Sequence, residues 1–166
     1  LFEQAGYDLE VEDYHFTILL GNPEKPMLQL NKGYSGDGGI PGYLMLSLLP
    51  NDYTLPRVQA ALAHECNHNV RFQFIKWNQQ TTLADWVVSE GLAESFAAEL
   101  YGKELIGPWV TSTSPEQLEE IKPIISSQLQ LTGMAEMAPY LYGDEIAKIQ
   151  GQIPVGMPYA AGYAYG

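Results

Sequence analysis

The sequence predicts one α+β domain, with a small N-terminal β-sheet followed by a mainly helical region. Before residue 50, apolar residues form short runs rich in β-branched and aromatic types, whereas after residue 54 they recur at helical spacing. The 166-residue length and 46% hydrophobic content are typical of a chain that buries one core. We therefore expect a single domain over residues 1–166. Both ends look truncated, because the chain starts at Leu1 and stops within an apolar stretch.

Three runs before residue 50 are predicted to be strands. Residues 14–20 (YHFTILL) and 27–30 (MLQL) are bounded by turn residues and could pair as a hairpin. Residues 33–42 (GYSGDGGIPG) are predicted to form a loop. Residues 43–49 (YLMLSLL) are the third strand candidate. This strand would suit the edge of a sheet, where it could pair with a peptide, but a buried strand fits equally well.

Helical spacing and capping signals predict the rest of the chain. A first helix is expected over 54–75, where a threonine cap precedes a first-turn proline, and a second over 82–101, which ends at a glycine. A third begins at Ser114, because SPEQ holds the cap, the proline and the glutamine of a capping box. Pro123 is expected to kink or end that helix early. Residues 133–166 are divided by proline and glycine into short helical pieces.

Composition excludes several classes of partner. A net charge of −12 with eight Lys and Arg residues disfavours nucleic acid and anionic membranes, which both attract basic surfaces. The single cysteine, Cys66, allows no internal disulfide and no cysteine-based zinc cluster. No apolar run approaches the roughly 20 residues of a membrane helix, and no signal peptide is visible. These absences slightly favour the cytoplasm, although a removed targeting segment stays open, and the oligomeric state is unknown.

The segment LAHECNHNVRF (62–72) carries the pattern HExxH. On a helix, His64 and His68 project the same way and can bind one metal ion through neutral imidazole nitrogens. Glu65 then lies beside the ion, where a general base could take a proton from a metal-bound water. The alternative is an amphipathic helix with polar residues on a solvated face. Two histidines alone do not make a catalytic zinc site, which normally has three protein ligands.

A third ligand is available on the next predicted helix. The segment DWVVSEGLAES (85–95) offers Glu90, and a helix returning alongside the first would bring it to the histidines. Glu94, one turn later, could accept a hydrogen bond from the outer nitrogen of a ligand histidine. Both could be plain surface acids, as on most helices. Their neighbours are mostly apolar, however, and a carboxylate in such a setting needs a partner such as a divalent ion.

HExxH followed by W-x-x-x-E-G-L-A-E (86–94) resembles the gluzincin metallopeptidases. This resemblance implies a zincin-like fold, His64, His68 and Glu90 as Zn²⁺ ligands, and Glu65 as the base. The segments AHECNHNVR, EGLAESFAAELYG and the terminal GYAYG are also similar to a family of predicted bacterial zinc-dependent proteases, from about residue 43 onward. The G-x-M-E-N element of the large gluzincin aminopeptidases is absent, so nothing supports amino-terminal trimming.

Hydrolysis of an amide also needs a donor to the developing oxyanion. Gluzincins that resemble this chain often use a Tyr or His near the C-terminus, so Tyr163 and Tyr165 are the candidates, with packing as the alternative. His15 is expected to be an ordinary strand residue. The glycine-rich 33–42 is no phosphate loop, because no G-K-[ST] follows it. Cys66 points off the histidine face and is expected to be a small core residue.

The leading hypothesis is a zinc metallopeptidase that hydrolyses peptide or protein substrates through a glutamate-activated, zinc-bound water. The main alternative is a non-catalytic, metal-stabilised module that binds peptides or regulates a partner. A metal-dependent hydrolase of non-peptide amides or esters also fits, because the motif does not specify the acyl partner.

Overall fold

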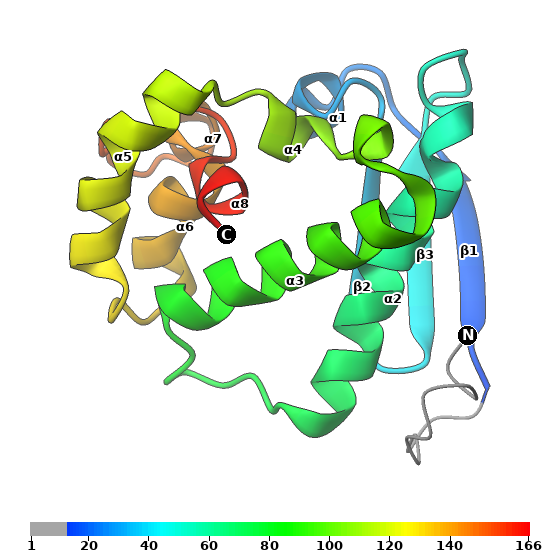
Figure 1. The fold of residues 1–166 in the computed structure, drawn as a ribbon, viewed down its shortest axis with the longest axis horizontal. Coiled ribbons are helices and arrows are strands. Elements are labelled where there is room, and N and C mark those ends of the chain that lie inside the picture. Colours follow the sequence, from blue (N-terminus) through cyan, green and yellow to red (C-terminus); the bar gives the residue numbers. More distant parts are fainter. Residues whose placement is uncertain (1–12) are drawn as a thin grey trace.

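The computed structural model describes residues 13–166, which form an α+β fold with a small sheet followed by helices, as predicted (Figure 1). The first twelve residues of the expected domain lie outside this range. In chain order the elements are β1 (His15–Leu20), α1 (Pro26–Leu30), β2 (Tyr34–Ile40), β3 (Tyr43–Leu48), η2 (Leu55–Arg57), α2 (Val58–Phe74), α3 (Leu83–Tyr101), η3 (Lys103–Leu105), α4 (Pro108–Thr111), α5 (Pro115–Gln128), α6 (Met134–Tyr142), α7 (Asp144–Ile149) and α8 (Ala161–Tyr165).

Within residues 13–166, three strands form one sheet with the order β1-β3-β2. β3 pairs in parallel with β1 and antiparallel with β2. Its alternate residues Leu44, Leu46 and Leu48 are buried on the face that packs against α2. The edge alternative for 43–49 is therefore wrong, because β3 has a hydrogen-bonded neighbour on each side. Among the described strands, β1 and β2 are the edge strands, and β2 is the one that packs extensively against α2.

The predicted strand at 27–30 is a helix, α1. Pro26 stands in its first turn, and Leu28 is buried against the chain near Gly21. The segment MLQL contains no β-branched residue, and leucine, methionine and glutamine are good helix formers. Short apolar runs do not distinguish helix from strand, and the proline decides for the helix here.

The predicted loop at 33–42 is mostly strand β2. Its glycines serve close packing, because a Cβ added at Gly36 would collide with the side chain of Glu65 and one at Gly38 with the Glu65 backbone. A strand with side chains at these two positions could not lie this close to α2. Tyr34 is buried at the start of β2 and anchors it in the core.

The helices 54–75 and 82–101 are confirmed as η2 with α2 and as α3. Thr82 and Asp85 form a capping box at the start of α3, and Gly102 ends the helix with φ of 103°. The predicted capping box at Ser114 is also present at the start of α5. These boundaries depend on local hydrogen bonds, which explains why a sequence pattern can locate them.

Pro123 does not end its helix, since α5 continues to Gln128. Proline removes the hydrogen bond to the carbonyl four residues earlier, on Glu119, which is an exposed residue where water can replace the lost donor. Ile121 and Ile125 flank the proline and are both buried in the core. Their burial favours continuing the helix past the proline.

The described residues form three apolar clusters, of which the two larger lie in different parts of the fold. One joins α3 to α5, α6 and α8 through residues such as Leu83, Ile125 and Leu141. The other joins the sheet to α2 and α4 through residues such as Leu46 and Trp109. Figure 1 shows the sheet at one end of the molecule and helices α5 to α8 gathered at the other, with α2 and α3 between them. Among the described residues, no helix has the length and apolar character needed to cross a membrane.

The contact between β2 and α2 predicts that substitutions at two neighbouring glycines change the stability of the fold to different extents. We expect Gly38→Ala to lower the free energy of unfolding by about 1–3 kcal/mol, the usual cost of overpacking, because its methyl group meets the Glu65 backbone. Gly39→Ala is the matched control, since its methyl group meets only the Asp37 side chain, at 3.3 Å. Urea unfolding of both variants measures the difference. Equal stabilities would contradict the close packing of β2 on α2.

The capping box of α3 predicts a pH-dependent contribution to stability. Hydrogen bonds from the Thr82 backbone and side chain lower the pKa of Asp85 below its ordinary value of 3.8. A carboxylate with a depressed pKa in the folded state stabilises the fold above its unfolded pKa and loses this effect as the pH falls through the folded value. The stability difference between wild type and Asp85→Ala should therefore be largest near neutral pH. Thermal unfolding below pH 4 should show the difference shrinking, and a constant difference would contradict this role.

Candidate metal centre

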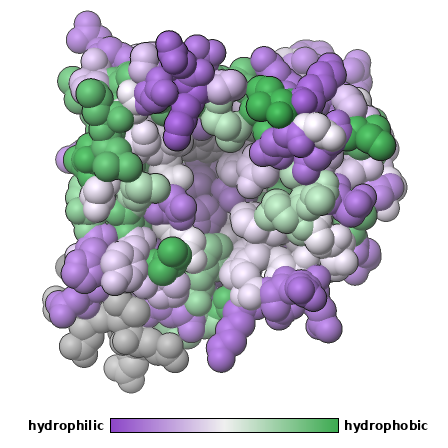
Figure 2. Space-filling view, turned by 180° about the vertical axis from the view of Figure 1, so that it is seen from behind, coloured by the Kyte–Doolittle hydropathy of each residue, from purple (hydrophilic) through white to green (hydrophobic). Residues whose placement is uncertain are grey.

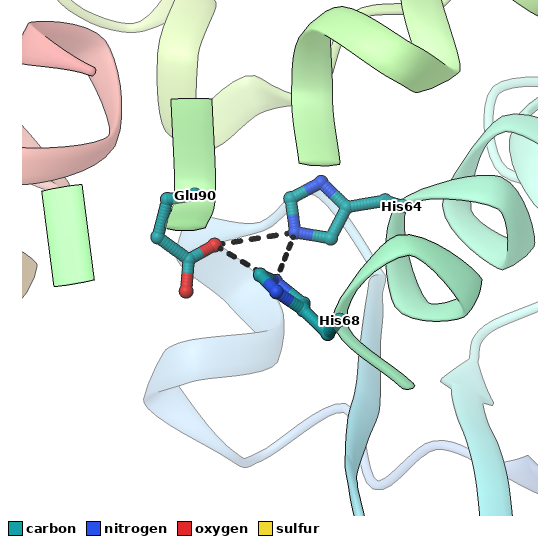
Figure 3. Close-up of side chains that lie close together, drawn as sticks. All are labelled: His64, His68 and Glu90. Carbon is teal, nitrogen blue, oxygen red and sulfur yellow. Dashed lines mark hydrogen bonds and ion pairs between the residues drawn. The ribbon is translucent and has the colours of Figure 1, made fainter. Parts of the chain in front are cut away.

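Two helices that pack against each other carry the residues of the predicted site. α2 holds His64, Glu65 and His68, and α3 holds Glu90 and Glu94. All five residues are buried, with exposures of 4–7%. Figure 3 shows the two rings reaching from one face of α2 towards Glu90 on α3. The structure thus brings together the two histidines and the glutamate that the sequence analysis singled out.

The three side chains converge through one atom each (Figure 3). The Nε2 atoms of His64 and His68 are 3.1 Å apart, and Glu90 Oε2 lies 3.2 Å from the first and 3.3 Å from the second. Tetrahedral zinc with bonds of about 2.0–2.1 Å places its ligand atoms about 3.3 Å from each other. Two imidazole nitrogens and one carboxylate oxygen are also a donor set that zinc accepts. The residues present therefore fit a metal ion, and the cluster could hold one.

A second set of hydrogen bonds orients the two rings. The outer nitrogen of His64, Nδ1, donates to Glu94 Oε2 at 2.8 Å, and Nδ1 of His68 lies 3.2 Å from Ser89 Oγ. Glu94 also accepts hydrogen bonds from the Gly107 backbone at 2.6 Å and from Trp109 Nε1 at 2.7 Å. When the His64 ring is neutral and donates from Nδ1 to Glu94, its Nε2 atom carries no proton and faces the cluster, which is the form that binds a metal ion.

The electrostatics of the cluster favour positive charge. Burial by itself lowers the pKa of His64, but the hydrogen bonds to Glu90 and Glu94 outweigh it and raise that pKa. Burial acts to raise the pKa of Glu90, and hydrogen bonds from His64 and His68 outweigh it and lower the pKa instead. The pKa of Glu65 is raised, chiefly by burial. Buried carboxylates beside neutral rings thus stabilise a bound proton and, by the same logic, a bound cation.

The cluster borders a cavity of about 450 Å³, seen as the hollow near the centre of Figure 2. Glu65 lies in its wall without belonging to the three-atom cluster. No Lys or Arg among the described residues lines it. The lining residues are Met27, Asn31, Ser35, Gly36, Asp37, Gly38, Gly39, His64, Glu65, His68, Phe72, Trp86, Glu90, Trp109, Tyr142, Ile146, Gln150, Tyr159, Ala160 and Tyr163.

The two tyrosines predicted as oxyanion donors have different positions. Tyr163 lines the cavity, and burial, followed by the charge of Glu90, raises its pKa well above the ordinary value, so its hydroxyl keeps its proton. Tyr165 does not line the cavity, and its hydroxyl pairs with Ser126 on α5 at 2.8 Å. A side chain turned towards α5 does not reach the cluster, so the structure brings only Tyr163 to the site.

His15 and Cys66 lie outside the site. His15 stacks on Tyr43 of the neighbouring strand, with ring centroids 5.1 Å apart. Cys66 is a free, partly buried thiol that does not line the cavity. Neither position supports a role in the metal cluster.

The sequence analysis did not identify several residues of the site. Asn69 is fully buried, accepts a hydrogen bond from the Gly42 backbone at 2.8 Å and donates to the carbonyls of Gly38, Ile40 and Tyr43. It therefore fastens the β2–β3 turn to α2. Trp109 and Tyr142 were missed because each reaches the site from a distant point in the chain, and Ser89 was missed although it is next to Glu90. An asparagine next to HExxH was the one visible hint, since a buried amide needs partners.

A buried His–His–Glu cluster beside a cavity, on two helices of a small α+β fold, defines a candidate metalloprotein. The family model described as "Predicted Zn-dependent protease (DUF2268)" matches residues 1–166. The chain belongs to this family.

Two proteins of Bacillus subtilis (strain 168) are similar to this chain. The uncharacterized protein YjfC is 43% identical over 165 residues, which is 99% of this chain and 54% of YjfC. The uncharacterized protein YjaZ is 33% identical over 78 residues, which is 46% of this chain and 30% of YjaZ. The chain thus spans about half of YjfC and a smaller part of YjaZ. No solved structure matches significantly.

The hydrogen bonds of Glu94 predict that metal binding by His64 depends on this glutamate. We expect Glu94→Gln and Trp109→Phe each to weaken Zn²⁺ binding about 10- to 100-fold, because residues behind a ligand commonly contribute that much. Glu99→Gln is the matched control, since Glu99 is an exposed acid on the same helix. Competition with a chromophoric chelator measures the affinities. Unchanged affinity in both variants would contradict a role for this hydrogen-bond chain in metal binding.

Proposed function

We propose that this chain is a zincin-like metallopeptidase domain of gluzincin type, with His64, His68 and Glu90 as ligands of Zn²⁺ and Glu65 as the general base. The observation that carries the proposal is the position of Glu65. Its carboxylate lies in the cavity wall beside the cluster, as a base must, while its neighbours His64 and His68 point at Glu90. The family description supports both the metal and the class of reaction.

A bound Zn²⁺ ion would polarise the peptide carbonyl and acidify a water molecule at the open position. Glu65 accepts a proton from the attacking water and passes it to the leaving nitrogen, so that the cleaved bond ends as a carboxylate and an amine. Gly36 allows the Glu65 side chain to lie against β2, which limits its movement. Glu94 serves as a positioning residue, since it orients the His64 ring through Nδ1.

Tyr163 is the proposed donor to the oxyanion. Its ring lies in the cavity wall, and its buried hydroxyl retains a proton to donate. α8 reaches this place because Gly91 on α3 has no side chain, and an added Cβ there would collide with Gly166. Tyr165, which faces Ser126, is left out of the proposal.

β2 is the proposed platform for the substrate backbone. Its residues 35–39 line the cavity, and the edge of β2 away from β3 has no strand neighbour among the described residues. A peptide could add to this edge through main-chain hydrogen bonds, which demand no particular sequence. β2 would thus take the role that the sequence analysis considered for 43–49 as one of two alternatives.

The non-catalytic alternative predicts a metal site without a base. The structure gives it no particular support, because Glu65 is buried at the cavity and is not part of the three-atom cluster. A hydrolase of non-peptide amides or esters would use the same groups. A panel of peptides, proteins and simple esters, each incubated with and without chelator, distinguishes the three.

Two substitutions separate the base from the ligands. Glu65→Gln should retain one Zn²⁺ per chain and lose peptide cleavage by at least about 10²-fold, the usual contribution of a general base. Glu90→Gln should lose both, because it removes a ligand. Zinc content by atomic emission, together with a peptide-library digest, gives the two readouts. Full cleavage by Glu65→Gln would end the mechanism, and unchanged zinc in Glu90→Gln would move the third ligand elsewhere.

A further inference from the structure

One end of the cavity has an aromatic wall that the proposed mechanism does not use. The Phe72 ring stacks on His68 with centroids 5.6 Å apart, Trp77 packs against Phe72 at 4.9 Å, and Trp86 against Trp77 at 4.4 Å. Phe72 and Trp86 line the cavity. The row therefore leads from a proposed metal ligand to a rigid aromatic surface at the cavity.

The second half of β2, which packs against α2 and carries the acid Asp37, also lines the cavity. Asn69 binds the carbonyls of Gly38 and Ile40 and lies one helical turn from Phe72, so this half of β2 runs beside the aromatic end of α2. Asp37 is exposed, lines the cavity and accepts a hydrogen bond from the Gly39 backbone at 2.9 Å. Among residues 13–166, no Lys or Arg forms an ion pair with it.

Asp37 contributes negative charge at the rim of the cavity. After burial and the charge of Glu90, Asp37 is one of the groups that raise the pKa of Tyr142 on α6, which also lines the cavity. No Lys or Arg of the described chain lines the cavity to neutralise Asp37, and the whole chain carries a net charge of −12.

We propose that this end of the cavity is a subsite for a lysine or arginine side chain of the substrate. The aliphatic stem lies against Phe72 and Trp86, and the charged group lies near Asp37. Aromatic faces attract cations, and long basic side chains commonly cover apolar surface with their stems. A net negative protein also steers cationic substrates towards it. The inference deepens the proposed function and rests on it.

The direction of β2 sets the position of this basic residue relative to the cleaved bond. β2 runs from Tyr34, near Trp109, to the Gly38–Ile40 end beside the aromatic wall. A peptide antiparallel to β2 therefore has its amino-terminal side at the aromatic end. The basic residue should precede the scissile bond.

The test uses a position-resolved peptide library with the zinc-loaded chain. We expect cleavage sites to be enriched in Lys or Arg on the amino side. The ratio of kcat/KM for a lysine peptide to kcat/KM for its norleucine counterpart should fall about fivefold in Asp37→Asn, which is the size of a partly desolvated ion pair. Asp52→Asn is the matched control, since Asp52 is exposed and does not line the cavity. The lysine-to-norleucine ratio of kcat/KM for Asp52→Asn should equal that of wild type.

A binding measurement separates failure of the subsite from failure of the peptidase function. Zinc-loaded Glu65→Gln is titrated with the same lysine and norleucine peptides, followed by tryptophan fluorescence. Tighter binding of the lysine peptide, lost on adding Asp37→Asn, supports the subsite whether or not wild type cleaves. Cleavage with no basic preference, or with a preference for aromatic residues, overturns the subsite and leaves the peptidase standing. Absence of cleavage together with equal binding overturns both.

Discussion

The packing of α2 against α3 around buried ionisable groups is the constraint on which the rest of this structure depends. His64, His68, Glu90 and Glu94 are all removed from water at this contact. Burying unpaired charges is costly, so each carboxylate must find hydrogen bonds or a cation. Hydrogen bonds between the histidine rings and the two glutamates offset part of the cost of burying these charges. A metal ion at the three converging atoms would offset more of it.

The surroundings of α2 follow from this requirement. Gly36 and Gly38 let β2 lie directly on the turn that carries Glu65, and Asn69 fastens the β2–β3 turn to the same helix. On the α3 side, Gly91 admits the end of α8, which brings Tyr163 to the cavity. Small residues stand where backbones approach, and polar residues stand where buried backbone groups need partners. The cavity is the space that these close contacts leave between the sheet and the C-terminal helices.

The family and the residues around the cavity carry different information about function. Membership of a family of predicted zinc-dependent proteases agrees with a buried cluster that could hold a metal, and about half of YjfC corresponds to this chain. The family description does not distinguish one substrate from another. We propose that this distinction depends on the aromatic row behind His68 and on Asp37 of β2, which has no ion-pair partner among residues 13–166.

The sequence by itself determined the features that depend on local spacing. HExxH places two rings on one helical face, the capping boxes at Thr82 and Ser114 start helices where predicted, and the glutamate-rich second helix returns to the first. Only the tertiary structure decided that 33–42 is a strand, that 27–30 is a helix, and that Asn69 and Trp109 belong to the site. Periodicity and caps are set by residues within one or two turns of each other. The close approach of β2 and the hydrogen bonds of buried side chains are set by partners 13 to 31 residues away, which no local pattern records.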